Sequence, residues 1–558
     1  MTAPGRSFAA DPRVFAPDLL SPTWHRQLVH TVVEESQGRP DAATLAFRDP
    51  YHKLTTDTGI AIGDPFKVSV VVPESTSTAT LFVGEVTALD LEIDNTGSFT
   101  VVRALGRAHR LQRGRRVEAF RDMSADAIVR KVAKNARLDV GRIDVPKVIY
   151  HQLSQAGVSD WDFLQDLAAQ LGVVVRVDEE DKLDFAPPRP TGTPVEVKHG
   201  KEVLALRATR TSADDVDAVQ VRSWDVAARE AFVATVPTKA GGTKAFGAAT
   251  ALVVDTPYGS DAETNVAARA LSESLRAGRF ELEAVIAGEP RLQVGVKVKL
   301  TDFGPEFDGL HTATAVRHTI DPDGGYRTTA VVGATPDRSL GGLTAGVGPR
   351  ARGPRFPGVA TGIVTAVGDP NDKQRGWVKL KFPWLDDKYE TNWVRTVQLG
   401  SQGGGVFGWD VNDEVLVAFE HGCLDLPYVV GGLYNGRNLP SAHDLPLVNG
   451  TGSVNRRSLV SRKGHRLELI DGVAGPPGVR VATGDSALEF RLDAARDTIT
   501  VRVAGGGEIS MGKQGVTVDA GAGRLELKGA SVSVTGQTGV TVDGGLEAVL
   551  RGDFVRIN

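Results

Sequence analysis

The chain has 558 residues, a formal net charge of −5 and 63 glycines, but only one cysteine. A slightly acidic chain gives no reason to expect nucleic acid or an anionic membrane as a partner. The single cysteine, Cys423, excludes an intrachain disulfide and a multi-cysteine metal cluster. The length favours three or more domains, and the many glycines favour a strand-rich fold with many turns.

The first residues carry no apolar segment behind basic residues, so we expect no secretory signal peptide. No run of eighteen apolar residues occurs in the chain, which excludes a conventional membrane helix. We therefore expect the protein to fold in the cytoplasm and to leave the cell, where it does so, by a route other than a signal peptide.

Residues 28–105 contain several runs in which β-branched residues partly alternate, and they are predicted to form strands. The period then becomes helical over residues 124–138, where Ser124 is placed as an N-cap.

A clearer helix is predicted over residues 159–172. Ser159 and Asp162 stand in capping-box positions, and Gly172 provides the C-terminal stop. The next residues predict a hairpin that turns at residues 179–181.

A third helix is predicted over residues 261–275, and a second strand group follows it. The order and spacing of this second group resemble those of the first. Val68, Val70, Phe82, Gly84 and Phe99–Val101 are matched by Val296, Val298, Phe307, Gly309 and Tyr326–Thr328. We infer two similar β-barrels within one hub domain, residues 1–345.

Residues 336–357 are rich in Gly, Pro and Arg and show no period, which is typical of an extended connector. We place a linker at residues 346–357. The arginines of this segment are interpreted as part of a solvated linker rather than as a polyanion site.

Residues 358–438 are predicted to form a five-stranded barrel of the oligonucleotide/oligosaccharide-binding (OB) type. Short bursts of alternating apolar residues are separated there by Gly, Asn and Asp residues. The bursts are Ile363–Val364, Val378–Phe382, Trp393–Val397, Val415–Phe419 and Val429–Leu433.

After a connector, residues 439–464, the chain becomes repetitive. Residues 465–558 contain pairs or triplets of alternating apolar residues, from Leu467/Leu469 to Val555/Ile557, separated by Gly, Asp or Ala. No unit can bury its apolar face alone, so the units must stack into one core. Polar partners such as Thr517, Glu526, Ser533 and Thr541 would then face water. The period allows either a parallel solenoid of one chain or a prism of three interleaved chains.

The candidate chemical residues do not complete a site. Glu420, His421 and Asp425 are interpreted as a barrel turn, because no second ligand pattern accompanies them. His311 and His318 are placed on opposite faces of one strand, and Cys423 is interpreted as a barrel residue. No histidine follows His465, so the sequence does not support a histidine-bound metal at the C-terminal tip. We assign no catalytic, cofactor-binding or metal-binding residue.

Several linked phrases resemble a known family. GIVTAVGDP, GWVKLKFPW, NWVR, GGGVFGWDVNDEVLVAFEHG and VVGGLYNG occur in order between residues 362 and 436. They resemble the barrel module of VgrG proteins, the spikes of contractile injection systems, which are related to phage tail spikes. The segments HRLQRGRRVEAFRDMSADAIV and SDWDFLQDLAAQLGVVVRV resemble the hub domain of the same family.

The resemblance implies a mainly β architecture: a hub with two β-barrels and a few helices, an OB-type barrel and a trimeric β-helical needle. It implies a non-enzymatic homotrimer without cofactors. Its hub would bind the hexameric inner tube and baseplate proteins, and its tip would bind a conical PAAR-type protein. Effector cargo is possible.

Within the family, the compact needle favours an extracellular phage-tail-like particle over a type VI secretion VgrG or a phage baseplate spike. An alternative of another class is a hydrolase or binding protein for cell-wall polysaccharides. Such an enzyme would need paired carboxylates in a cleft.

Overall fold

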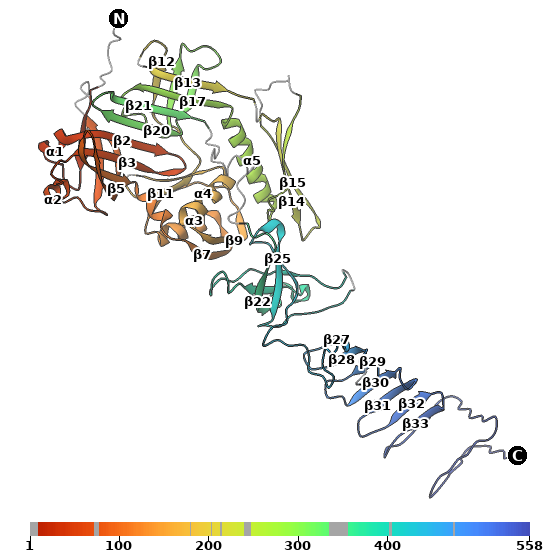
Figure 1. Cartoon of the computed structure of the whole chain (residues 1–558). Helices are drawn as coiled ribbons and strands as arrows, with labels where there is room; N and C mark the ends of the chain where they lie inside the picture. Colours follow the sequence, from red (N-terminus) through yellow and green to blue (C-terminus); the bar gives the residue numbers. More distant parts are fainter. Residues whose placement is uncertain are drawn as a thin grey trace. The chain divides into compact units, whose positions relative to one another are not determined.

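The computed structural model describes residues 9–71, 78–178, 180–201, 203–212, 215–238, 247–333, 355–400, 404–472 and 475–557. It divides into two compact units, Met1–Leu433 and Tyr434–Asn558, which are considered separately below. Figure 1 shows that strands are the main regular structure in both units, as predicted. Most of the predicted linker at residues 346–357 lies outside the described residues.

The first unit is built on a ten-stranded sheet with the order β1-β4-β5-β6-β3-β2-β20-β21-β17-β13. Val102, Phe47 and Phe66 lie in the core of its N-terminal half. The sheet joins the two predicted strand groups, because β2 of the first pairs with β20 of the second. Its strands are β1 (Asp11–Phe15), β2 (Leu28–Ser36), β3 (Arg39–Arg48), β4 (Pro65–Val71), β5 (Thr78–Asp94), β6 (Gly97–Leu105), β13 (Val203–Arg210), β17 (Phe280–Ala287), β20 (Ala315–Asp321) and β21 (Gly325–Val332).

Three short helices accompany the N-terminal strands: α1 (Pro22–Gln27), α2 (Leu54–Thr58) and the 3-10 helix η1 (Arg107–Gln112). The residues of the sequence echo are not arranged alike in the two groups. Those of the first group lie on neighbouring strands β4, β5 and β6. In the second group, Val296 and Val298 lie in a separate small sheet with the order β12-β18-β19. Its strands are β12 (Thr191–Lys198), β18 (Val296–Thr301) and β19 (Gly309–Thr312).

The predicted helices are confirmed. α3 (Ala125–Asn135) begins after Ser124, whose hydroxyl accepts a hydrogen bond from the Ala127 N–H. α4 (Asp160–Leu171) begins after Ser159 and ends at Gly172, which has φ +68° and so takes the left-handed conformation that favours glycine.

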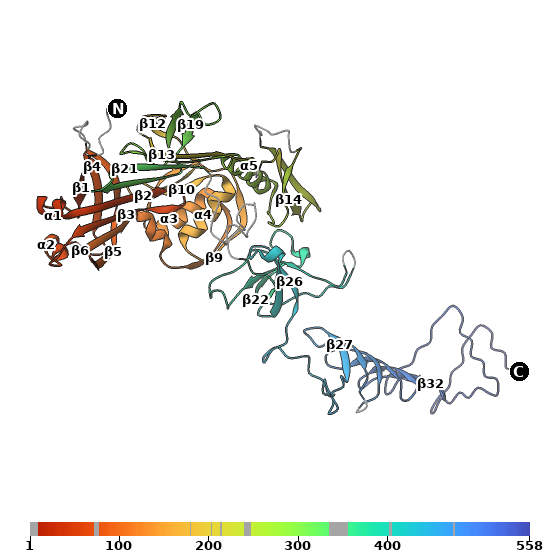
Figure 2. The same cartoon turned by 45° about the horizontal axis from the view of Figure 1, so that its top comes forward.

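Figures 1 and 2 show α3 and α4 side by side. They share a core with Phe120, Phe185 and neighbouring apolar residues. The strands around them are β7 (Arg116–Ser124), β8 (Asp139–Ile143), β9 (Ile149–Val158), β10 (Val174–Val177) and β11 (Lys182–Ala186). β10 and β11 form the predicted antiparallel hairpin.

The third predicted helix is α5 (Asp261–Ala277), which is capped by Ser260. It packs through Ala267, Ala268 and Leu271 against a three-stranded sheet with the order β15-β14-β16. The strands are β14 (Ala218–Asp225), β15 (Glu230–Pro237) and β16 (Thr250–Val253). Among the described residues, no helix is both long and apolar enough to span a membrane.

The predicted barrel is a five-stranded sheet with the order β23-β22-β25-β26-β24. Each predicted burst supplies one of its strands. They are β22 (Val359–Val367), β23 (Val378–Lys381), β24 (Arg395–Thr396), β25 (Glu414–Phe419) and β26 (Pro427–Gly432), with the 3-10 turns η3 (Lys373–Arg375) and η4 (Glu420–Gly422). Val364, Phe382 and Val417 are fully buried in its core.

The second unit contains a seven-stranded antiparallel meander in which each strand pairs with the next along the chain. We call it the shaft. Its strands are β27 (Arg456–Val460), β28 (Arg466–Ile470), β29 (Gly478–Ala482), β30 (Leu488–Asp493), β31 (Thr498–Val503), β32 (Glu508–Gly512) and β33 (Gly515–Asp519). β27 lies in the stretch predicted to be a connector. The antiparallel pairing excludes a parallel solenoid of one chain over these strands, and residues 520–557 form no strand.

Candidate functional site

One face of the shaft is apolar and lies open in the single chain. Its side chains form two files that cross all seven strands. The first file begins at the charged Arg457 of β27 and continues through the apolar residues Leu469, Val479, Leu492, Ile499, Met511 and Val516. The second file is apolar throughout: Leu459, Leu467, Val481, Phe490, Val501, Ile509 and Val518. Exposure reaches 66% at Val516 and is 36% at Ile499, while Val479 and Leu492 are half-buried. A continuous apolar face of this kind marks an interaction surface.

The apolar alternation continues beyond the last strand. Leu525 and Leu527, Val532 and Val534, and Val540 and Val542 keep the spacing of the shaft, but residues 520–557 pair with no strand among the residues that the structure describes. Leu527 is 68% exposed and Val542 is 82% exposed. This segment therefore presents strand-like sequence without a sheet to join.

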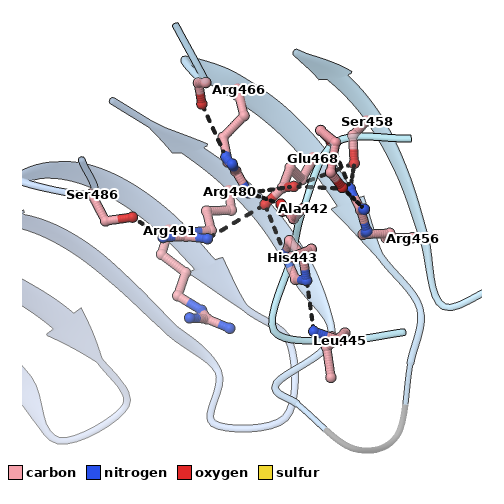
Figure 3. Close-up of polar contacts among 12 residues, drawn as sticks. Ala442, His443, Leu445, Arg456, Ser458, Arg466, Glu468, Arg480, Ser486 and Arg491 are labelled. Carbon is pink, nitrogen blue, oxygen red and sulfur yellow. Dashed lines mark hydrogen bonds and ion pairs between the residues drawn. The ribbon is translucent and has the colours of Figure 1, made fainter. Parts of the chain in front are cut away.

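The opposite face of the shaft carries a buried ionic cluster, which we call the Glu468 cluster (Figure 3). Glu468 is fully buried on β28 and lies opposite Ser458 of β27 and Arg480 of β29. Ser458 Oγ donates to Glu468 Oε1 at 3.3 Å, and Arg480 Nη1 lies 3.5 Å from Oε2. Arg456 and Arg466 approach Oε1 at 3.7 and 3.5 Å.

A strap of residues 441–446 covers this cluster. Arg456 Nη2 donates to the Ser441 carbonyl at 2.5 Å. His443 Nδ1 accepts a hydrogen bond from the Leu445 N–H at 2.8 Å, so the ring proton resides on Nε2, which lies 3.3 Å from Glu468 Oε2. The strap thus adds a histidine donor and backbone acceptors to the arginine–carboxylate contacts, and together they compensate the buried charges.

In the first unit, a polar contact joins the barrel to the β7–β9 sheet. Tyr389 and Gln152 are both buried, and Gln152 Nε2 donates to the Tyr389 hydroxyl at 2.8 Å. Ser154 Oγ lies 2.8 Å from the same hydroxyl. Burial raises the pKa of Tyr389, and the nearby Asp425 adds to this effect, so the hydroxyl stays protonated. Ala156 of β9 completes the contact by packing into the barrel core.

Two further contacts flank Tyr389. Asn392 Nδ2 donates to the His151 carbonyl at 2.9 Å, and Arg121 Nη1 donates to Glu390 Oε2 at 2.5 Å. Burial acts to raise the pKa of Glu390, but hydrogen bonds from Thr365 and Arg121 outweigh it and hold the pKa below its usual range. The carboxylate is therefore charged at neutral pH, and the barrel is tied to the hub at several points.

The structure separates Glu420, His421 and Asp425. His421 is exposed and has φ +48°, while Glu420 accepts a hydrogen bond from the Tyr428 hydroxyl. Asp425 is buried near Tyr389, and Cys423 is buried in the barrel. The three side chains do not converge on one point.

His311 and His318 do not share one strand, contrary to the prediction. Strand β19, which contains His311, ends at Thr312. The next strand, β20, contains His318 and belongs to the ten-stranded sheet. His311 stacks on Phe280 with ring centroids 3.8 Å apart. His318 is fully buried, and its Nε2 lies 3.0 Å from the Leu292 carbonyl. Burial lowers its pKa to about 4.

The barrel also carries an open groove of about 780 Å³. Phe356, Trp384 and Phe419 line it, together with Glu414, and Trp384 Nε1 donates to the Thr361 carbonyl at 2.8 Å. The groove is mainly apolar and lacks a second carboxylate among its lining residues. Over the described part of the chain, no group of three or more His, Cys, Asp or Glu side chains is placed to hold a metal.

Sequence reasoning missed the two polar assemblies. Glu468 stands between Leu467 and Leu469 and is predicted by alternation to be a water-facing residue. The one available signal is the density of arginines around it, at positions 456, 457, 462, 466 and 480. Tyr389 and Gln152 are too far apart in the chain for any local pattern to connect them.

Two family models match the chain. One, described as the Alg8 N-terminal domain, matches residues 67–322. The other, described as the type VI secretion system/phage-baseplate injector OB domain, matches residues 360–434, which form the barrel. A search of curated protein sequences found no match.

Solved structures are also similar. The Francisella PdpA-VgrG complex in its half-lidded form has a chain that matches with TM-score 0.52 and 11% identity, over 91% of this chain and 88% of that chain. The Escherichia coli c3393 protein, a type VI secretion component described as similar to phage T4 tail proteins gp27 and gp5, matches with TM-score 0.48 and 16% identity, over 73% of this chain and 97% of that chain. A 43 kDa prophage tail protein from Shewanella oneidensis matches with TM-score 0.44 and 14% identity, over 58% of this chain and 98% of that one.

Proposed function

We propose that this chain, which has the VgrG-type fold, is the central spike of a contractile injection system. The observation that carries the proposal is the open apolar face of the shaft, next in sequence to a barrel that matches the baseplate injector OB domain. A lone chain leaves this face in water. An assembly of several copies buries it and converts a thin sheet into a solid stem.

The stem is a homotrimer in this proposal. Closed rotational symmetry is the rule for identical subunits, and it lets each copy present the same apolar face to the common axis. Three copies of a hub that contains two strand groups would offer six strand groups around that axis, which suits a hexameric inner tube. Residues 520–557 would pair between chains and extend the stem toward a PAAR-type tip protein. The other partners in this proposal are baseplate proteins and effector cargo.

The proposed role is mechanical and not enzymatic. Contraction of a sheath would supply the work, and the spike would need only stiffness and symmetry. We favour a phage-tail-like particle that assembles in the cytoplasm and is released, because the shaft is compact. A type VI secretion spike and a phage baseplate spike are the alternatives. Mass spectrometry of particles sedimented from culture medium and from cell lysate distinguishes a released particle from a retained one.

The molecular mass of the purified full-length chain in solution tests the proposal. We expect about three times the 59.2 kDa of one chain, measured by light scattering after size-exclusion chromatography. A monomer at all protein concentrations would refute the trimeric stem. A stable dimer would also refute it and would indicate that two shaft sheets pack face to face.

A peptidoglycan-release assay on the same sample tests the polysaccharide-hydrolase alternative. The spike proposal expects no release of soluble fragments above the level of a heat-denatured sample. Release that saturates with substrate would assign an enzymatic activity to this chain.

A further inference from the structure

The alternation of apolar residues determines which face of the shaft is apolar. It does not determine the register in which neighbouring strands pair. In the observed register Leu467 lies opposite Val481, and Leu469 lies opposite Val479. A slip of two residues would place Leu469 opposite Val481. Every apolar side chain would stay on its face, and leucine would still meet valine. Hydrophobic alternation therefore leaves such slips open in a repetitive sheet.

Glu468 distinguishes the observed register from the slipped ones. It lies opposite Arg480, and the neighbouring positions of β29 on that face are Gly478 and Ala482. A slip of two residues in either direction would place the carboxylate opposite one of these two residues, and neither has a side chain that can bond it. Because Glu468 is fully buried, the loss of Arg480, one of the three arginines that compensate its charge, is unfavourable.

The same contacts continue to the adjacent strands. Ser458 donates to Glu468 from β27, and Arg480 Nε donates to Glu489 Oε2 of β30 at 2.7 Å. The polar chain Ser458–Glu468–Arg480–Glu489 thus crosses four consecutive strands. Beyond it, the ion pair between Lys513, just after β32, and Asp497, just before β31, is largely exposed, at 82% and 56% of the two side chains, so it opposes a slip far less.

We propose that the Glu468 cluster is the register pin of the shaft. It fixes the alignment of β27 to β30, and the later strands add to an edge whose register is already set. The cluster works in the way that a single buried polar residue specifies the alignment of otherwise uniform apolar repeats. This inference concerns pairing within one chain, so it holds or fails independently of the spike proposal.

Disulfide trapping in the full-length chain tests whether the Glu468 cluster fixes the register. In a Cys423→Ser background, the pair Leu467→Cys and Val481→Cys reports the observed register. The pair Leu469→Cys and Val481→Cys reports the slipped register. Crosslink yields are read by mass spectrometry of peptides after mild oxidation.

Glu468→Gln is expected to raise the slipped-to-native yield ratio about tenfold, since the buried charge that opposes the slip is gone. Asp471→Asn is the matched control, because Asp471 is an exposed carboxylate just after the same strand and binds Arg457 across β27 and β28. It should leave the ratio unchanged.

Should Glu468→Gln fail to fold, the double variant Glu468→Gln with Arg480→Gln carries the same measurement, because it removes both opposed charges. A slipped-to-native ratio in the folded variant that equals the ratio of the Asp471→Asn control would overturn the proposal.

Discussion

The Tyr389 hydroxyl of the barrel accepts a 2.8 Å hydrogen bond from Gln152 Nε2 on strand β9 of the hub. Tyr389→Phe would remove this acceptor and leave the buried Gln152 Nε2 and the half-buried Ser154 Oγ without it. We expect a loss of about 1–3 kcal/mol in the free energy of unfolding, measured by urea denaturation. Tyr51→Phe, at a residue that is 78% exposed, is the control and should be neutral. Equal stabilities of the two variants would show that the contact does not stabilise the junction.

The buried His318 should make stability depend on pH. Burial lowers its pKa from 6.5 to about 4, so between these pH values the unfolded chain binds a proton that the folded chain does not. The free energy of unfolding therefore does not depend on His318 protonation above pH 6.5. It falls by roughly 3 kcal/mol in total as the pH is lowered from 6.5 toward 4.

Denaturation of His318→Gln at several pH values from 7 to 4.5 should show a flatter pH dependence than that of the natural chain. His421→Asn, at an exposed histidine, should keep the natural dependence. A His318→Gln chain with the same pH slope as the natural protein would assign the acid sensitivity to other groups.

The apolar face predicts a sharp difference between neighbouring residues of β33. Val518 lies in the second apolar file, while Thr517 is also exposed in the single chain but lies on the opposite face. Val518→Asp would bury a charge at the proposed interface between chains, and we expect it to raise the concentration at which the assembly dissociates by about 100-fold or more. Thr517→Asp should leave the assembly intact. Sedimentation velocity across a dilution series measures both variants, and equal behaviour would place the interface elsewhere.

Hydrogen exchange should separate the shaft from the segment that follows it. The strands β28 to β31 pair within the chain, so their amides should be protected in the natural protein and in the dissociated Val518→Asp variant. The amides of residues 520–557 should be protected only in the assembly, because their proposed partners are in other chains. Protection of this segment in the dissociated variant would mean that each tail folds by itself.

Local signals predicted the elements whose determinants are close in sequence. The caps Ser124, Ser159 and Gly172 placed α3 and α4, and the alternation of the barrel bursts placed its strands. The order of the ten-stranded sheet was not predictable in this way, since Val32 of β2 pairs with Thr319 of β20.

The features of the candidate site were largely outside the reach of such patterns. A glutamate between two leucines looks the same whether it faces water or, like Glu468, three arginines. The end of β19 between His311 and His318 was missed because Ala313 and Ala315 continue an apolar alternation across the gap between β19 and β20.

The meander has a consequence for biosynthesis. Each of its strands pairs with the one made just before it, so the shaft can grow strand by strand as the polypeptide leaves the ribosome, at a small loop-closure cost. The large N-terminal sheet must wait, because β2 finds its neighbour β20 only after most of the first unit has been translated.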